Sequence, residues 1–393
     1  MPRGNCWDEI IDKVDPVSVA NTPLESRNAK QPMAAGQPIL HWLRYIPLSI
    51  GAMAMVLGLW TGLLQLGIPL PGGTFPPTEL HGALMIAGFL GTVISLERTV
   101  AIGHWWAYGA PAVSAAGALA LAANFGQAGA LAFVFASAIF LVTTASIAFR
   151  QSAMFVVVLM IAAACWMAGS VLWLMGHTIS SISGWWLDFL ILTIAAERLE
   201  LSRMLRVSWV SQTLFVVVGS LPVIGAARTE LVEAWAPFTS AGLIGLAVWL
   251  VHHDVARRTI RLPGLPRFSA CSILAGHMWL AAAGAMLALA SSGAVIFLYD
   301  AVIHAIAIGF VMSMIFGHAP IILPAIIGLR VRFVAASYAS LALLHLSVLL
   351  RLAGDIFGLN DVRAASGILT VLALVSYAAI LIAASSRQTL RSA

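Results

Sequence analysis

The chain has 393 residues, of which 61% are hydrophobic and 9% are charged, and its mean hydropathy is +0.95. Soluble domains carry roughly a quarter charged residues, so this composition excludes a soluble enzyme. The net charge of +5 does not indicate nucleic-acid binding, because membrane insertion itself concentrates Lys and Arg in cytoplasmic loops. The sequence therefore predicts an all-α integral membrane protein whose main partner is the lipid bilayer.

Three segments organise the chain. Residues 1–41 are polar and lack the basic-then-apolar order of a cleavable signal peptide, so we expect a polar cytoplasmic N-terminal tail. Residues 42–386 form the predicted transmembrane domain, and residues 387–393 form a short cytoplasmic C-terminal tail. The three cysteines are far apart and show no CxxC or CxxCH spacing, which argues against a disulfide framework, a zinc site or an attached c-type haem.

The transmembrane domain contains twelve apolar stretches, each close to the roughly 20 residues that cross a bilayer. They cover residues 42–66, 79–102, 107–123, 128–149, 152–175, 185–205, 208–225, 232–252, 268–291, 295–317, 332–352 and 364–386. With the N-terminus inside, eighteen of the 21 Lys and Arg fall in cytoplasmic segments, and the exceptions are Arg228, Arg351 and Arg363. This bias predicts about 12 helices with both termini cytoplasmic, in a bacterial-type inner (cytoplasmic) membrane.

The loop at residues 253–267 carries four arginines and two prolines. We interpret it as a cytoplasmic anchor placed by the topology rule, with a lipid-headgroup or partner site as the alternative. No soluble domain or P-loop interrupts the bundle, so any chemistry must occur within the membrane or at its edge.

The helix at 79–102 begins with two residues that could ligate a metal. His81 and Met85 are four apart and share a helix face, and an imidazole with a thioether suits copper(I) or an axial position on haem iron. Gly82, Gly88 and Gly91 leave room beside this face for a flat macrocycle or for another helix. The alternative interpretation is tight helix packing around a hydrogen-bonded histidine.

The helix at 295–317 is the richest in candidate residues. His304 lies about 14 Å from its periplasmic end, and Asp300 lies one turn earlier, where its carboxylate could orient the imidazole ring. His318 is about 21 Å further along, too far for both histidines to bind one metal ion. By depth, we expect His81, His304 and His345 to group toward the outside, and His277 with His318 toward the inside.

A Glu-Arg pair occurs near the cytoplasmic end of two helices, as Glu97-Arg98 and as Glu197-Arg198. Carboxylates in the hydrocarbon are costly, at about 2.5 kcal/mol or more on insertion scales, so they mark candidate sites. An ion pair between helices and a proton relay are the two interpretations. The recurrence is also what a transporter built from repeats would show.

Two of these helices resemble a known family. The run from His81 through Met85 to Gly88-Phe89 resembles the first signature of the NnrS family, His-x-His-x-Met-x-x-Gly-Phe, with Ala83 at the second histidine. NnrS proteins are polytopic haem- and copper-containing membrane proteins linked to nitric oxide stress and denitrification. That family's later signature is matched by His304-Ala305, Gly309, Met312 and Gly317-His318, with a shorter distance between the histidines.

A fainter resemblance is to the catalytic subunits of haem-copper oxidases. In these, a His-Gly-x-x-Met helix holds the low-spin haem and a Gly-His-Pro helix holds copper, whereas here Ala319 separates His318 from Pro320. The resemblance to NnrS implies that His81, His304 and His318 are ligands of haem b or copper.

Three functions are compatible with these features. The first is a haem-binding protein, with copper as a further metal, in nitric oxide or respiratory redox metabolism, served by an electron-transfer partner or respiratory complex subunits. The second is a proton-coupled secondary transporter that uses the histidines and Glu197. The third is a non-catalytic subunit or assembly factor of a respiratory membrane complex. The sequence leaves open whether the protein is an enzyme.

Overall fold

A computed structural model describes residues 38–71, 77–151, 153–202, 207–227, 232–290 and 293–387. Most of the expected N-terminal tail and residues 388–393 of the expected C-terminal tail lie outside these ranges, as does Arg228. The predicted boundary at residue 42 falls inside the first described helix, α2 (Pro38–Gln65). The description below concerns the compact unit Leu43–Ala393.

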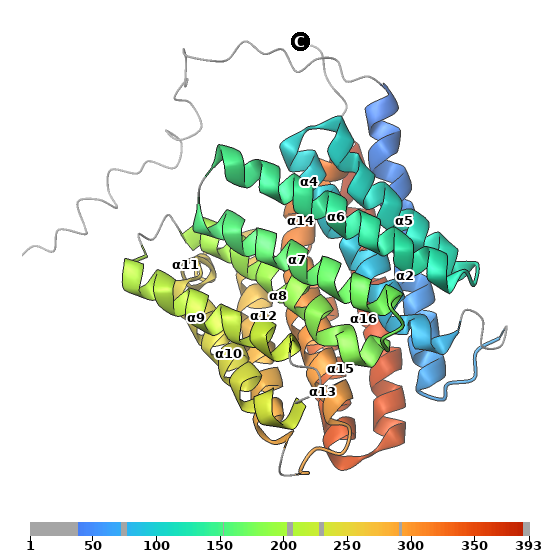
Figure 1. Cartoon of the computed structure of the whole chain (residues 1–393), viewed down its shortest axis with the longest axis vertical. Coiled ribbons are helices and arrows are strands. Elements are labelled where there is room, and N and C mark those ends of the chain that lie inside the picture. The colour runs from blue at the N-terminus through green and yellow to red at the C-terminus, as the bar shows by residue number, and fades with distance from the viewer. Residues whose placement is uncertain are drawn as a thin grey trace, which may run out of the picture. The chain divides into compact units, whose positions relative to one another are not determined.

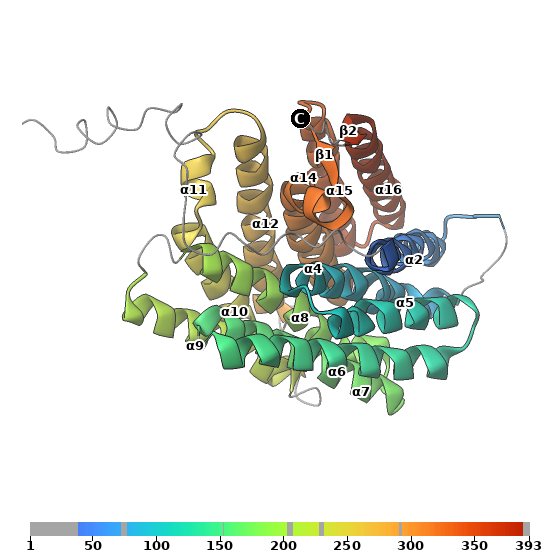
Figure 2. The same cartoon turned by 90° about the horizontal axis from the view of Figure 1, so that it is seen from above.

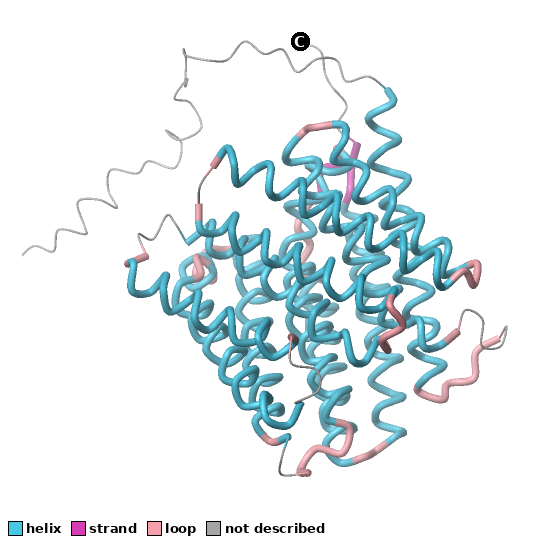
Figure 3. The backbone as a smooth tube through the Cα atoms, viewed as in Figure 1, coloured by secondary structure: helices cyan, strands magenta, loops and turns pink. Residues whose placement is uncertain are grey.

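This unit is built from helices joined by short connections (Figures 1 and 3). After α2, the first half contains η2 (Thr78–Leu80), α3 (His81–Ala83), η3 (Leu84–Gly91), α4 (Thr92–Ile102), η4 (Trp105–Tyr108), α5 (Gly109–Ala122), α6 (Gly126–Arg150), α7 (Met154–Leu174) and α8 (Ile179–Ser202). The second half contains α9 (Trp209–Ala226), α10 (Val232–His253), α11 (Ala256–Thr259), α12 (Leu265–Ala288), α13 (Leu298–His304), η8 (Ala305–Met312), α14 (Ser313–Ile327), α15 (Ser337–Phe357) and α16 (Asn360–Ala384). Two three-residue strands, β1 (Leu329–Val331) and β2 (Ser385–Arg387), pair antiparallel.

Each of the twelve predicted ranges contains a helix. Within the described residues, ten helices are long and apolar enough to cross a membrane, and the windows have mean hydropathies of 1.5 to 2.4. The other two ranges correspond to α5, which has 14 residues, and to α10. The structure is thus compatible with a multi-pass membrane protein, while the count of twelve spans and the cytoplasmic termini stay predictions.

One helix runs well past its predicted end at residue 317, because a distant side chain compensates for a proline. Proline lacks the N–H that would bond to the carbonyl four residues earlier, so Pro320 frees the carbonyl of Phe316. The Tyr377 hydroxyl of α16 donates a hydrogen bond to that carbonyl at 2.5 Å. A partner on a neighbouring helix is what allows proline inside a membrane helix. The helix therefore continues through Pro324 to Ile327.

Helices that are adjacent in the chain also pack together, such as α5 with α6, α7 with α8, and α15 with α16. Helix α12 contacts α10 and the continuous rod formed by α13, η8 and α14. In Figure 2, α6 and α7 lie on one side, α12, α15 and α16 on the other, and α4 and α8 between them. Among the polar side chains of these two helices, Thr92, Ser95, Thr99, Asp188, Thr193 and Arg198 are buried.

Gly91, the last residue of η3, is a position where the packing of the interior can be tested. A Cβ at this position would lie 2.5 Å from the indole of Trp166. Trp166 cannot withdraw, because it is fully buried and stacks on Phe189 with ring centroids 4.9 Å apart. We expect Gly91→Ala to destabilise the protein by about 1–3 kcal/mol, the usual cost of overpacking, measured by thermal unfolding in detergent. The matched control is Gly126→Ala, whose Cβ would meet nothing within 4 Å, and equal melting temperatures for the two variants would contradict this account.

Candidate functional site

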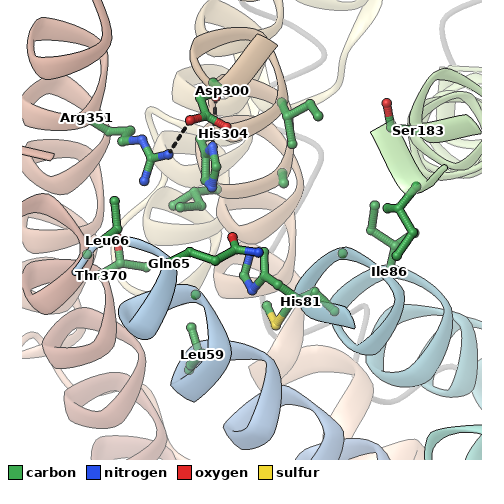
Figure 4. Close-up of a pocket in the computed structure, with 18 of the residues that line it drawn as sticks. Leu59, Gln65, Leu66, His81, Ile86, Ser183, Asp300, His304, Arg351 and Thr370 are labelled. Atoms are coloured by element: carbon green, nitrogen blue, oxygen red, sulfur yellow. Dashed lines mark hydrogen bonds and ion pairs between the residues drawn. The ribbon is translucent and has the colours of Figure 1, made fainter. Parts of the chain in front are cut away.

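A cavity of about 550 Å³ lies between α2, α3, α8, α13 with η8, α15 and α16 (Figure 4). Its volume is within the range of roughly 300–1,000 Å³ that is usual for cofactor and small-molecule sites. Leucine, isoleucine and methionine side chains make up much of the wall. The polar and charged side chains that line it include His81, Asp300, His304, Arg351 and Arg363.

The cavity brings together His81 from the first half of the chain and His304 from the second half. Their ring centroids are 6.4 Å apart and their planes are inclined by only 17°. Figure 4 shows the His304 ring above that of His81, with Asp300 and Arg351 beyond His304. The sequence predicted that His304 lies deeper than His81. The helix of His304 begins at Leu298 and not at residue 295, so His304 is about 9 Å from the start of its helix at 1.5 Å per residue.

Both rings are fixed in the same tautomer. The Nδ1 of His81 donates to the carbonyl of Gly58 at 2.7 Å, and the Nδ1 of His304 donates to the carbonyl of Asp300 at 2.7 Å. A carbonyl can only accept, so each Nδ1 carries the proton and each Nε2 keeps its lone pair. Neither Nε2 has a hydrogen-bond partner among the described residues. This is the arrangement of metal-binding histidines, whose second nitrogen is commonly bonded to a backbone carbonyl.

A π-helix follows each histidine, directly or within one helical turn. The segment η8 follows His304 directly, η3 begins three residues after His81, and both contain eight residues. π-helices are rare in proteins and occur frequently at functional sites, because their i→i+5 bonds change the direction of the side chains that follow.

Two glycines of α2 let the His81 helix approach closely. A Cβ on Gly62 would lie 2.8 Å from the His81 ring, and a Cβ on Gly58 would lie 2.6 Å from the sulfur of Met85. Gly58 also provides the carbonyl that accepts from His81. The GxxxG spacing of these two residues in an apolar helix is a recognised signal of close helix contact and could have identified them from the sequence.

The glycines beside His81 were predicted to admit either a macrocycle or another helix, and the structure divides them between the two. Gly82 lines the cavity. By contrast, a Cβ on Gly88 would meet Ala118 of α5 at 3.2 Å and Ala54 of α2 at 3.4 Å, while Gly91 accommodates the indole described above. These two glycines serve helix packing, because neighbouring side chains occupy the space that a macrocycle would need.

Two arginines and two aspartates form a closed ion-pair cluster at one end of the cavity. Asp355, whose side chain is fully buried, accepts from Arg351 at 2.9 Å and from Arg363 at 2.7 Å. Asp300 bonds to Arg363 and lies 3.4 Å from Arg351. The guanidinium of Arg363 also lies 3.9 Å from the ring centroid of Phe297. Sequence reasoning missed this cluster, although Arg351 and Arg363 were two of the three exceptions to the positive-inside bias.

The expectation that the Asp300 carboxylate orients His304 is wrong. The backbone carbonyl of Asp300 holds the ring, and its carboxylate faces the two arginines. The reason is electrostatic, since hydrogen bonds between two ionised groups are stronger than one from a neutral imidazole.

His318, also predicted as a metal ligand, lies elsewhere and both its ring nitrogens are occupied. Its Nδ1 donates to the carbonyl of Met314 at 2.6 Å, and its Nε2 accepts from Arg198 at 2.5 Å. Arg198 comes from α8, so no pattern within the His318 helix could reveal the contact. The assignment of His318 as a ligand is therefore not supported by the geometry.

The predicted ion pair between the two Glu-Arg helices is present, since Arg98 of α4 bonds to Glu197 of α8. Glu97 lies close enough to interact with the charges of Arg98 and Glu197. Arg198 extends this network to His318 and interacts with the charge of Asp254. These groups therefore form one polar network, on helices α4, α8 and α14 and in the loop after α10.

His277 joins the same network through Asp254, at 3.2 Å from its carboxylate. Burial alone would raise the pKa of the Asp254 carboxyl, but the hydrogen bond from His277 and the charge of Arg198 hold this pKa below its ordinary value. His277 and His318 are thus linked through Asp254 and Arg198 and do not contact each other directly. His345, expected beside His81 and His304, instead accepts from Trp279 at 3.0 Å and does not line the cavity.

Among the residues that the structure describes, no three His, Cys, Asp or Glu side chains are grouped so that they could hold a metal ion. The pair His81 and His304 is thus a two-ligand arrangement. Haem suits such a pair, because the macrocycle supplies the other ligands of its iron.

A family model described as "Domain of unknown function (DUF8744)" matches residues 44–386. The chain belongs to this family. No curated protein and no solved structure matches the chain. The DUF8744 match covers the predicted transmembrane domain almost completely, so both histidines and the four-residue ion-pair cluster lie inside the DUF8744 region.

Proposed function

We propose that this DUF8744 protein binds haem b between His81 and His304, as a multi-pass protein of a bacterial-type inner membrane. The observation that supports the proposal best is the pair of imidazoles in one cavity. Their ring centroids are 6.4 Å apart, and neither Nε2 has a hydrogen-bond partner among the described residues. The resemblance of the two histidine helices to NnrS signatures is consistent with the proposal.

The ring separation suits a single metal between the two side chains. Imidazole nitrogens bind a metal ion at about 2.0–2.1 Å, so two nitrogens that held one ion would be at most about 4 Å apart. Each ring centroid lies roughly 1 Å beyond its nitrogen, which gives about 6 Å between centroids on the same distances. The observed 6.4 Å agrees with this geometry.

The rest of the cavity complements the chemistry of haem. Apolar walls suit the macrocycle, whereas Arg351 and Arg363, which also line the cavity, are already paired with Asp300 and Asp355. Met85 adds a thioether to the two imidazoles, so copper(I) is the alternative metal for the same residues. Haem bound here would supply one-electron and nitrogen-oxide chemistry, which implies an electron-transfer partner and a role in nitric oxide or respiratory redox metabolism.

Absorption spectroscopy with metal analysis tests the proposal on the purified full-length protein. We expect a Soret band that changes on reduction and close to one iron per chain. A colourless protein with neither iron nor copper, after expression in cells supplied with both metals and a haem precursor, would overturn it.

Proton-coupled transport is the second candidate, and a separate observation favours it. The network of Arg98, Glu197, Arg198, His318 and Asp254 places linked ionisable groups among apolar helices, as transporters of protons do. Proton uptake by reconstituted, colourless protein would support this function over haem binding.

A further inference from the structure

The connection between α10 and α12 forms a second cavity, separate from the histidine site. It has a volume of about 610 Å³ and is lined by His252, Asp254, Arg257, Arg258, Arg261 and Leu262. Three of its six lining residues are arginines. A fourth, Arg267, follows in the first turn of α12, and it donates to the carbonyl of Ile260 at 3.3 Å.

The positive charge of this cavity is not balanced by nearby acids. Arg257 donates to the backbone carbonyl of His252 at 3.1 Å, while Arg258 and Arg261 are exposed, and none of the three has an ion-pair partner among the described residues. The one carboxylate in the lining, Asp254, is only 5% exposed. It accepts from the backbone N–H of Ala256 at 2.8 Å and contacts His277 in the interior. The cavity therefore presents guanidinium groups to a ligand without competing anions.

The position of the cavity indicates where the ligand comes from. It lies where α10 ends and α12 begins, and α12 is one of the helices able to span a membrane. Leu262 is 50% exposed beside the arginines, so an apolar surface adjoins the charged one. A lipid at the membrane boundary presents the same combination of an anionic headgroup and an apolar chain, and clusters of arginines next to membrane helices attract anionic lipids.

We propose that this cavity binds the phosphate group of an anionic phospholipid. Arg258 and Arg261 hold the phosphate oxygens through paired N–H donors, the geometry for which guanidinium groups are suited. Leu262 contacts the start of an acyl chain. The site is independent of the histidine cavity and of the proposed haem.

Native mass spectrometry of the full-length protein tests the proposal. Protein from micelles containing phosphatidylglycerol should retain one or more of these lipids, and should retain phosphatidylcholine weakly. The double variant Arg258→Gln/Arg261→Gln should retain phosphatidylglycerol about tenfold less well, the effect of losing about 1.4 kcal/mol of binding. Arg150→Gln, which removes an exposed arginine from the end of α6, is the matched control and should retain the lipid as the wild type does.

Three further results test the proposed phospholipid site. Arg258→Lys/Arg261→Lys keeps the charge but loses the paired donors, so intermediate retention supports the proposed geometry. Equal retention by the wild type and the glutamine variant, both folded by their melting temperature, would overturn the site. If inorganic phosphate displaces the lipid at low concentration and stabilises the protein equally, the ligand is free phosphate and the lipid assignment is wrong.

Discussion

His81→Ala and His304→Ala are each expected to lower the haem-to-protein ratio to roughly a tenth of the wild-type value or less, because each removes one of the two nitrogens that would hold the haem. Both side chains line the cavity, and neither Nε2 has a hydrogen-bond partner in the described part of the chain. The measurement is the Soret absorbance per chain after purification. If copper is the metal, the same two variants should lose copper, and Met85→Leu should weaken its binding as well.

The matched control is His345→Ala, which removes a histidine that is bonded to Trp279 and is absent from the cavity lining. We expect its haem content to equal that of the wild type. His318→Ala should likewise keep its haem, since Arg198 and Met314 occupy the ring nitrogens of His318. Haem loss in His318→Ala but not in His81→Ala would refute the ligand assignment.

Asp355→Ala is expected to cost about 3–5 kcal/mol of stability, the usual effect of removing one partner from a buried ion pair. Asp355 is fully buried and binds two arginines whose side chains are 8% and 14% exposed, so its loss leaves Asp300 as the remaining acid of the cluster for both of them. The measurement is thermal unfolding in detergent together with the yield of folded protein.

Asp361→Ala is the control for this second variant, because Asp361 is exposed in the first turn of the neighbouring helix α16. Its effect should stay below about 1 kcal/mol, the range of a helix-terminal charge. If Asp355→Ala unfolds at the same temperature as Asp361→Ala, the cluster does not stabilise the bundle.

Hydropathy was sufficient to locate the helices but not all of their ends. An apolar stretch needs only its own residues to be recognised, and every predicted range contains a helix. The extension of α14 through Pro320 depends on Tyr377, a residue of another helix. Contacts that cross the bundle are not visible in a local pattern, and the predicted range therefore ended this helix too early, at residue 317.

The candidate site could also be predicted only in part. The cost of burying an imidazole singled out His81 and His304, and the structure brings these two together. This cost could not distinguish them from His318, whose Nε2 accepts a hydrogen bond from Arg198 of α8. Nor could it identify Asp355, because an acid near a helix end resembles a solvated one until both arginines are placed against it.

The two π-helices set how the histidines can be compared between members of the DUF8744 family. Each π segment stands between its histidine and the remainder of the same helix. One residue more or fewer within it turns everything before it by about 100° relative to everything after it. A relative could thus keep both histidines in its sequence and still direct one of them away from the cavity. The length of chain between His81 and Thr92, and between His304 and Ser313, is therefore as diagnostic of the site as the histidines themselves.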